Sequence, residues 1–376
     1  MRIGIDGGCW SNRRGFGRFL RELLHALARQ EEQHEYAVVL DRRAAAEFHL
    51  GSPFRKVVAP IREGVADAAR SDGRRSLGDL ARMAWAARRE PVDAFFFPAV
   101  YSYFPLLRRT RVLLGIHDAI ADRNPHRSFS SAANRRNWRW KNSLALAQAD
   151  LVVTVSRYSQ RCIEETYGVA SGRIRVLPEA ASPTFRPCPS PEGARPYILN
   201  AGGLSPNKNL AALIRAFHRL KARRDGIRLV LVGNDSNDPF FSHAAELKKL
   251  VADLALEREV DFPGFVPDED LVRFYSGAAV FAMPSLDEGF GLPLLEAMAC
   301  GAPVIVSRGN ALEEVAGDAA VLADPDSVES IAAALDRVLA DGELRREMRQ
   351  ASLRRAGMFS WDKSASRMLD IFREVQ

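Results

Sequence analysis

Two glutamates on either side of a glycine-containing turn are the residues of this chain best suited to chemistry. Glu288 stands before the turn and Glu296 after it, with Gly289 and Gly291 between them. The short apolar run before the turn predicts a buried strand, and Pro293 suits the first turn of a helix. Side chains lean toward the start of a helix, so both carboxylates can face the same loop. Carboxylates beside the free amides of a helix start can bind a ligand that carries hydroxyl groups and an anion, such as a nucleotide sugar.

A lysine at the start of another helix can hold a phosphate. Lys208 follows a predicted strand and the glycine turn Gly202-Gly203, and it precedes a helix that begins near Asn209. A cation in this position can reach an anion bound at the helix start. Many lysines at helix starts are merely solvated, and the sequence by itself leaves both interpretations open.

A histidine and an aspartate follow a buried strand in the first half of the chain. Residues 111–116 are mostly apolar and lead into His117 and Asp118. Ligands bind at the carboxyl ends of the strands in an open parallel sheet, which is where this pair falls. An isolated pair of this kind is more often structural, and Asp118 can serve only to orient His117 or to cap the next segment.

The beginning of the chain has the strand, glycine loop and helix of a Rossmann-like unit. Residues 3–6 predict the strand, and residues 19–27 have apolar side chains at helical spacing. Only Gly15 and Gly17 fall at a suitable spacing, so the glycine pattern of dinucleotide binding is incomplete and a dehydrogenase is disfavoured.

Predicted strands and helices alternate along the rest of the chain. This alternation indicates an α/β fold with parallel sheets covered by helices on both faces. A chain of 376 residues is long enough for two domains. Residues 183–196 contain five prolines and one glycine, so we expect the linker there. The prediction is a first domain over 1–186 and a second over 187–361.

The composition excludes several classes of protein. Hydrophobic residues make up 47% of the chain and charged residues 27%, as in ordinary globular domains. No apolar run approaches the ~20 residues of a membrane helix, and the chain begins as a strand without the apolar segment of a signal peptide. The four cysteines are widely spaced, so neither a zinc site nor a disulfide scaffold is expected. These features favour a cytoplasmic protein with reduced thiols.

Charge is distributed unevenly between the two halves. Residues 1–190 carry 31 Lys/Arg against 19 Asp/Glu, a net +12, whereas the remainder carries 22 against 28, a net −6. The most basic and aromatic stretch is residues 134–141. We expect a helix there, with its tryptophans packed inward and its arginines solvated. The alternative is a surface for anionic lipid headgroups or a lipid-pyrophosphate acceptor, and a third is nucleic acid, for which no recognition module is visible.

The stretch from Glu288 to Glu296 resembles the E-x7-E signature of retaining glycosyltransferases, in particular glycosyltransferase family 4. Two glutamates at this spacing also occur on ordinary strand–loop–helix units, but the surrounding Pro-Ser, Gly-Phe-Gly-Leu-Pro and Glu-Ala-Met-Ala-Cys-Gly strengthen the resemblance, which extends along nearly the whole chain. It implies the GT-B fold, in which two Rossmann-like doubly wound parallel-sheet domains face each other across a cleft. It also implies that the final helix, 362–376, crosses back onto the first domain.

The resemblance implies the reaction as well. A hexose would pass from a nucleoside diphosphate sugar to an acceptor hydroxyl with retention of the anomeric configuration and without a metal or other cofactor. Asp324 and Asp326 have the spacing of a metal-binding pair, but their position before a helix favours capping. The loop around Lys208 slightly resembles that of mannosyltransferases that use GDP-mannose, and UDP-hexoses stay open.

The resemblance leaves the acceptor open. A saccharide, a lipid-linked saccharide or a small molecule would fit, and the basic half of the chain would allow peripheral contact with the inner face of the membrane. A nucleotide-sugar epimerase or a glycosyl phosphorylase on the same fold is one alternative function. A non-catalytic protein that binds a nucleotide sugar or an anionic surface is the other.

The resemblance also assigns roles to single residues. Lys208 would hold the donor diphosphate, and Glu288 would contact the hexose hydroxyls. Glu296 would accept hydrogen bonds from the ribose, and His117 would contact the sugar or its leaving group. The remaining donor-binding positions come from four loops and are Gly15, Gly17, Gly203, Asn209, Gly264, Phe265, Val266, Gly289, Phe290, Gly291 and Leu292.

One position departs from the family pattern. Many relatives carry an arginine where this chain has Gly202 or Gly203. Lys208 therefore either holds the diphosphate by itself or shares the task with an arginine from elsewhere, such as Arg13 or Arg14.

Overall fold

The chain forms two compact units. The computed structural model describes residues 1–13, 15–31, 34–61, 64–65, 76–107, 109–189, 195–221, 224, 226–234 and 242–376. One unit consists of Met1–Glu179 with Ser360–Gln376, and the other of Ala180–Phe359. Within the predicted linker, residues 190–194 lie outside the described residues.

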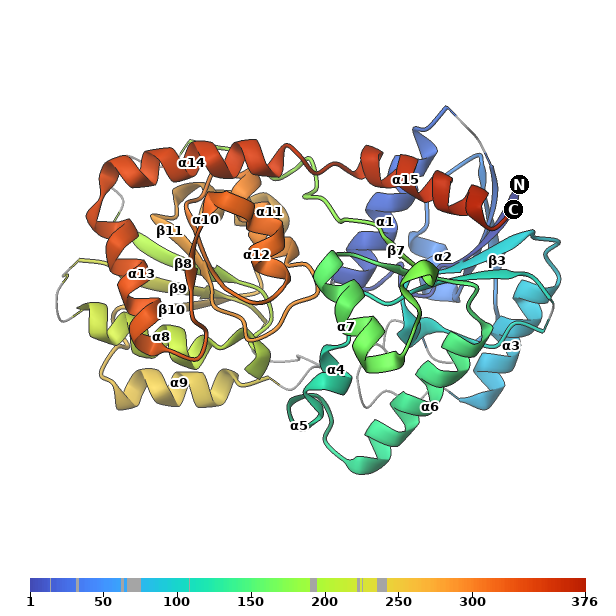
Figure 1. Cartoon of the computed structure of the whole chain (residues 1–376), viewed down its shortest axis with the longest axis horizontal. Helices are drawn as coiled ribbons and strands as arrows, with labels where there is room; N and C mark the ends of the chain where they lie inside the picture. The colour runs from blue at the N-terminus through green and yellow to red at the C-terminus, as the bar shows by residue number, and fades with distance from the viewer. Residues whose placement is uncertain are drawn as a thin grey trace. The chain divides into compact units, whose positions relative to one another are not determined.

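The first unit is built on a seven-stranded sheet in which every pairing is parallel, in the order β3-β2-β1-β4-β5-β6-β7 (Figure 1). The strands are β1 Arg2–Asp6, β2 Glu35–Leu40, β3 Phe54–Val58, β4 Ala94–Phe97, β5 Arg111–Gly115, β6 Leu151–Thr154 and β7 Ile174–Val176. The helices are α1 Gly15–Ala28, α2 Arg42–Glu47, α3 Leu77–Arg88, α4 Ile120–Arg123, α5 Pro125–Ser128, α6 Ala132–Gln148, α7 Arg157–Tyr167 and α15 Trp361–Glu374, with short 3₁₀ turns η2 Val100–Ser102 and η3 Ser171–Arg173.

The C-terminal helix α15 completes the first unit by packing along α1. The two helices lie side by side in Figure 1. The ring of Trp361 meets that of Phe19 edge to face at 5.9 Å. Ser364 Oγ donates to the carbonyl of Pro178 at 2.6 Å, which ties α15 to the segment after β7. The apolar face predicted for α1 is buried, so these two helices share one core.

The second unit repeats the architecture with six parallel strands in the order β10-β9-β8-β11-β12-β13. The strands are β8 Tyr197–Ala201, β9 Arg228–Val232, β10 Val260–Gly264, β11 Val280–Met283, β12 Val304–Ser307 and β13 Ala320–Ala323. The helices are α8 Leu210–Lys221, α9 Ala244–Asp253, α10 Asp268–Gly277, α11 Leu292–Ala299, α12 Ala311–Ala316, α13 Val328–Ala340 and α14 Gly342–Ala356, with 3₁₀ turns η4 Pro206–Lys208 and η5 Gly317–Ala319.

Buried side chains of α8, α9 and α13 pack against one face of this sheet. Helices α10, α11, α12 and α14 lie on the other side (Figure 1). Both units are therefore doubly wound α/β layers, which confirms the predicted fold class of two Rossmann-like parallel-sheet domains. In the described part of the chain, no helix combines the length and the hydrophobicity that crossing a membrane requires.

The end of β5 tests how tightly the first sheet is packed. A Cβ atom on Gly115 would lie 2.2 Å from the carbonyl oxygen of Pro98, which is backbone and cannot rotate away. Gly115→Ala should therefore destabilise the first unit by roughly 1–3 kcal/mol through overpacking. All five tryptophans belong to this unit, so tryptophan fluorescence during urea unfolding measures the change. Gly172→Ala is the matched control, because an added Cβ there has nothing within 4 Å. Equal unfolding midpoints for the two variants would contradict the packing argument.

Candidate active site

The strand order of the second unit predicts where a ligand binds along the carboxyl ends of its strands. The chain adds β9 and β10 on one side of β8 and β11, β12 and β13 on the other. Ligands of open parallel sheets bind where the order reverses, beyond the carboxyl ends of the strands. Here that point lies between β8 and β11, from which residues 202–209 and 284–291 continue.

Lys208 and Glu288 meet beyond the carboxyl ends of β8 and β11. The ammonium group of Lys208, at the end of η4, donates to Oε1 of Glu288 at 2.6 Å. Both side chains are largely buried, so the contact is a charge-assisted hydrogen bond with little solvent screening. The sequence proposed these residues separately, and the structure brings them together.

Two asparagines fix the loops that carry the pair. Asn209 lies in the left-handed region with φ 57°. Its side-chain amide donates to the carbonyls of Pro284 at 3.1 Å and Pro325 at 2.7 Å. The side-chain amide of Asn207 donates to the carbonyl of Asp287, and the backbone carbonyl of Asn207 accepts from the N–H of Leu286 at 2.9 Å. The predicted donor-binding residue Asn209 thus makes loop-to-loop contacts in the structure, and Asn207 was missed although it stands in the same polar stretch.

A left-handed glycine starts the helix between the two glutamates. Gly291 has φ 95° and precedes α11, and a Cβ atom on it would lie 2.3 Å from Cδ2 of Leu312. Its carbonyl accepts from Leu294 N–H at 2.9 Å, as at the first turn of a helix. Phe290 is buried and meets Phe359 edge to face at 5.9 Å. This packing sets the direction of the Gly289–Leu292 backbone.

Glu296 lies in the next turn of α11 and turns toward α10. Its Oε2 accepts a hydrogen bond from the hydroxyl of Tyr275 at 3.1 Å. Tyr275 is fully buried and packs against the rings of Phe281 and Phe185. Glu288 and Glu296 are both buried in the second unit, and the residues that donate to them, Lys208 and Tyr275, lie on different elements. Tyr275 was missed, because nothing local marks a core tyrosine as the partner of a distant carboxylate.

The remaining donor-binding candidates of this unit also lie at or beyond the carboxyl ends of the strands. Gly202 and Gly203 follow β8, and Gly264 ends β10 with φ 76°. The carbonyl of Gly264 accepts from Gly233 N–H at 3.1 Å, which joins the ends of β9 and β10. Phe265 is 64% exposed, an unusual exposure for a ring that follows a strand. The predicted base-binding turn thus presents backbone and one open aromatic face.

In the first unit, the glycine loop is held by side chains from α1 and η2. Arg21 donates to the carbonyls of Trp10 at 2.5 Å and Asn12 at 2.9 Å, and burial lowers the pKa of its guanidinium. Asn12 donates to the Tyr101 hydroxyl at 3.2 Å, whose pKa burial raises. The loop backbone is therefore fixed before any ligand contact.

The two predicted glycines of this loop differ. A Cβ on Gly17 would lie 1.8 Å from the carbonyl oxygen of Asn12, so only glycine fits there. Gly15 is exposed, with open space around its missing Cβ. Arg13 is exposed as well, and Arg14 lies outside the described residues.

His117 is held on both ring nitrogens. Its Nε2 lies 3.0 Å from the carbonyl of Pro98 and its Nδ1 3.3 Å from Oε1 of Glu179. The rings of Phe16 and Phe19 meet the imidazole edge to face at 4.9 and 4.7 Å. Glu179 was missed, although a carboxylate after the last strand of the sheet obeys the same rule that identified His117.

The aspartate beside His117 has a local partner. Asp118 Oδ1 accepts from Ile120 N–H at 2.9 Å in the turn that starts α4. This contact agrees with the interpretation that Asp118 caps the following segment.

No cluster of three or more potential metal ligands occurs among the described residues. Asp324, of the Asp324–Asp326 pair, accepts from the backbone N–H of Asp326 at 3.0 Å. The helix α13 is capped by Ser327, whose hydroxyl accepts from Ser330 N–H, so the capping predicted for the aspartates falls one residue later. The four cysteines are free thiols, and burial raises the pKa of Cys300, beside α11, to about 12.

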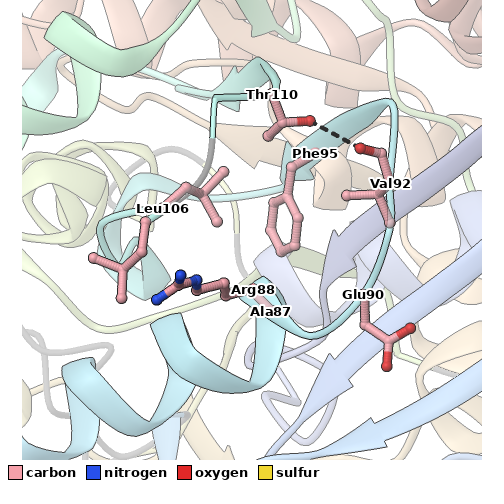
Figure 2. Close-up of a pocket in the computed structure, with 8 residues that line it drawn as sticks. Ala87, Arg88, Glu90, Val92, Phe95, Leu106 and Thr110 are labelled. Carbon is pink, nitrogen blue, oxygen red and sulfur yellow. Dashed lines mark hydrogen bonds between the residues drawn. The ribbon is translucent and has the colours of Figure 1, made fainter.

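A small pocket lies at the amino ends of β4 and β5 in the first sheet. Figure 2 shows it between the end of α3 and the segments before β4 and β5, where Thr110 donates to the carbonyl of Val92 at 3.2 Å. Its volume of about 10 Å³ admits about one water molecule. It lies at the amino ends of the strands and is too small for a nucleotide sugar.

Two family profiles divide the chain between them. The description "Glycosyltransferase Family 4" matches residues 13–184, and "Glycosyl transferases group 1" matches residues 184–355. The chain belongs to the family 4-like glycosyltransferases. The sequence resemblance, drawn from the stretch around Glu288 and Glu296, is thereby confirmed at the level of the family.

The curated relatives that this chain resembles include a mannosyltransferase and a glycosyltransferase. The chain is 33% identical to O-antigen chain mannosyltransferase B of Escherichia coli over 241 residues, which is 61% of this chain and 62% of the relative. It is 32% identical to D-inositol 3-phosphate glycosyltransferase of Acidothermus cellulolyticus over 245 residues, 61% of this chain and 54% of the relative. The chain thus spans less than two thirds of the length of these relatives.

Solved structures share the fold over the whole chain. Sucrose-phosphate synthase from Thermosynechococcus elongatus has a TM-score of 0.79 at 19% identity, covering 100% of this chain and 99% of that one. HepE from Anabaena, in complex with UDP-glucose, has a TM-score of 0.74 at 19% identity, covering 100% of both chains. The chain therefore has the GT-B fold.

Asn209 offers a test of how the two site loops are joined. Asn209→Gly keeps the left-handed backbone and removes two side-chain hydrogen bonds, so it should lose roughly 1–3 kcal/mol of stability. Asn209→Ala should lose about 1 kcal/mol more, because a Cβ is unfavourable at this φ. Far-ultraviolet circular dichroism during urea unfolding measures both. An Asn209→Ala protein as stable as the wild type would contradict the assigned contacts.

Proposed function

We propose that this glycosyltransferase moves a hexose from a nucleoside diphosphate sugar to an acceptor hydroxyl, with retention of the anomeric configuration and without a metal. The observation that carries the proposal is the buried Lys208–Glu288 pair at the point where the strand order of the second unit reverses. It puts a cation for a diphosphate and a carboxylate for sugar hydroxyls within one hydrogen bond of each other. Membership of the family 4-like glycosyltransferases supports the same reaction.

Donor and acceptor capacity allow both residues to bind ligand while they stay paired. An ammonium group has three N–H donors, and the contact with Glu288 uses one, which leaves two for phosphate oxygens. The carboxylate of Glu288 accepts from Lys208 through Oε1, and its other oxygen can accept from a hydroxyl. Lys208, the backbone amides of residues 288–291 and the dipole of the helix that follows them would stabilise the negative charge that develops on the departing diphosphate.

The other predicted residues would complete the donor site. Glu296, held by Tyr275, would accept from the ribose hydroxyls. The exposed ring of Phe265 and the backbone of Gly264–Val266 would contact the base. The ring of His117 is held by Glu179 and the Pro98 carbonyl. The family resemblance implies that this residue contacts the hexose or its leaving group.

We propose GDP-mannose or a UDP-hexose as the donor. The similarity to O-antigen chain mannosyltransferase B supports mannose, and the shared fold of HepE bound to UDP-glucose keeps a UDP-hexose in the proposal. A saccharide or glycolipid under assembly is the acceptor class that the relatives favour, since one builds an O-antigen chain. Residues 1–190 carry an excess of positive charge that suits an anionic acceptor.

Removing either member of the ion pair should reduce turnover. Lys208→Ala and Glu288→Ala each lose a hydrogen bond to a charged group. We therefore expect kcat/KM to fall roughly tenfold to a hundredfold or more. Transfer from a labelled nucleotide sugar measures it, and thermal unfolding checks the fold, because either variant leaves an uncompensated buried charge. Glu347→Ala, on the exposed side of α14, is the control. Wild-type turnover by a folded Glu288→Ala protein would remove its assigned role. An epimer or a sugar phosphate as the product would contradict transfer itself.

Ligand-induced stabilisation should identify the donor. The correct nucleotide sugar at about 100 times its Kd adds roughly 2.7 kcal/mol to the stability of the unit that binds it. A thermal-shift series with UDP, GDP, UDP-glucose and GDP-mannose measures this, and Lys208→Ala should remove the shift. A shift that survives in Lys208→Ala would contradict diphosphate binding by this lysine.

A further inference from the structure

Helix α6 is held in a fixed rotation by its inner face. Trp138 Nε1 donates to Asp122 at 2.9 Å, and Asn142 donates to the Tyr167 hydroxyl at 3.4 Å. Tyr167 in turn donates to the same carboxylate at 2.8 Å, and Ala145 is completely buried. These contacts join α6 to α4 and α7, so the opposite side of the helix must face solvent.

The outer side of α6 carries apolar and cationic residues together. Trp140 is 64% exposed, and Leu144, one turn further along, is 38% exposed. Arg136 and Arg139 are exposed on the same side, and Arg135 is exposed next to Arg136 in the first turn of the helix. We call these five residues the α6 surface. The expectation that the tryptophans of this segment pack inward is therefore right for Trp138 and wrong for Trp140, which lies about half a turn away on the helix.

The arginines of the α6 surface differ from several other surface arginines of the unit. Arg29, Arg55 and Arg111 each pair with a carboxylate. Among the described residues, no carboxylate lies within ion-pair distance of Arg135, Arg136 or Arg139, and α6 itself contains no acidic residue. These three arginines therefore have no carboxylate to neutralise their charge, and the indole of Trp140 beside them exposes apolar surface to water.

We propose that the α6 surface docks onto an anionic phospholipid membrane. Arginines bind phosphate groups through paired N–H donors, and tryptophan prefers the boundary between headgroups and acyl chains. Leu144 adds apolar area on the same side, as in helices that lie in the membrane interface. A nucleic acid would use the charge but gains nothing from an exposed Leu beside the Trp, so the apolar residues favour lipid. This docking needs no turnover, so it stands or fails independently of the proposed transfer reaction.

Vesicle sedimentation tests the proposal with the full chain. The wild type should bind phosphatidylcholine vesicles that contain about a third phosphatidylglycerol, should bind pure phosphatidylcholine vesicles weakly, and should lose binding in high salt. The combined variant Arg135→Glu, Arg136→Glu and Arg139→Glu should weaken the partition coefficient by about a hundredfold or more, since each cation contributes about fivefold. Trp140→Ala should weaken it by several-fold, through lost apolar burial.

A charge-matched variant separates this surface from net charge. Arg258→Glu, Arg337→Glu and Arg354→Glu change three exposed arginines of the second unit by the same charge. This variant should bind vesicles within about threefold of the wild type, since these arginines lie outside the α6 surface. Equal losses in the two triple variants would overturn the proposal. So would a wild type that binds a homopolymeric RNA but not the anionic vesicles, or unchanged binding by the α6 variant when circular dichroism shows both variants folded.

Discussion

Parallel pairing between β8 and β11 is the constraint on which the candidate active site depends. The two strands are neighbours in the sheet although β9 and β10 separate them in sequence. The loops that follow them therefore begin side by side at the carboxyl ends of the strands. Lys208 and Glu288 arrive there from opposite sides of the strand-order reversal. Neither charge could be buried by itself without a cost of several kcal/mol, and pairing offsets that cost.

Neutral groups hold the loops so that the charged groups need not. Asn207 and Asn209 satisfy backbone carbonyls of the loop after β11, and Ser307 and Asn310 donate to the carbonyl of Ser285 in the same loop. Because amide and hydroxyl donors fix the backbone, the shape of the loop does not rest on the Lys208–Glu288 contact. The pair can therefore share its remaining donors and acceptors with a ligand without unfolding the loop.

The residues of the first unit that we propose for the reaction and for membrane docking lie on different elements. The ends of its strands carry His117, Glu179 and the glycine loop, as the geometry of a parallel sheet requires. The helix α6 lies between β5 and β6 in sequence, and its outer face carries Arg136, Arg139 and Trp140. A reaction at the strand ends and contact with a charged surface through α6 make no competing demands on the same side chains.

The sequence by itself determined the local elements and the family. Apolar runs identified the strands, helical spacing identified α1, and the alternation of the two required parallel sheets, because such patterns depend only on near neighbours in the chain. The stretch from Glu288 to Glu296 was specific enough to indicate a glycosyltransferase. Only the tertiary structure decided which side chains are partners. Tyr275 with Glu296, Glu179 with His117 and the outward turn of Trp140 depend on contacts between elements far apart in sequence, and no local pattern encodes those distances.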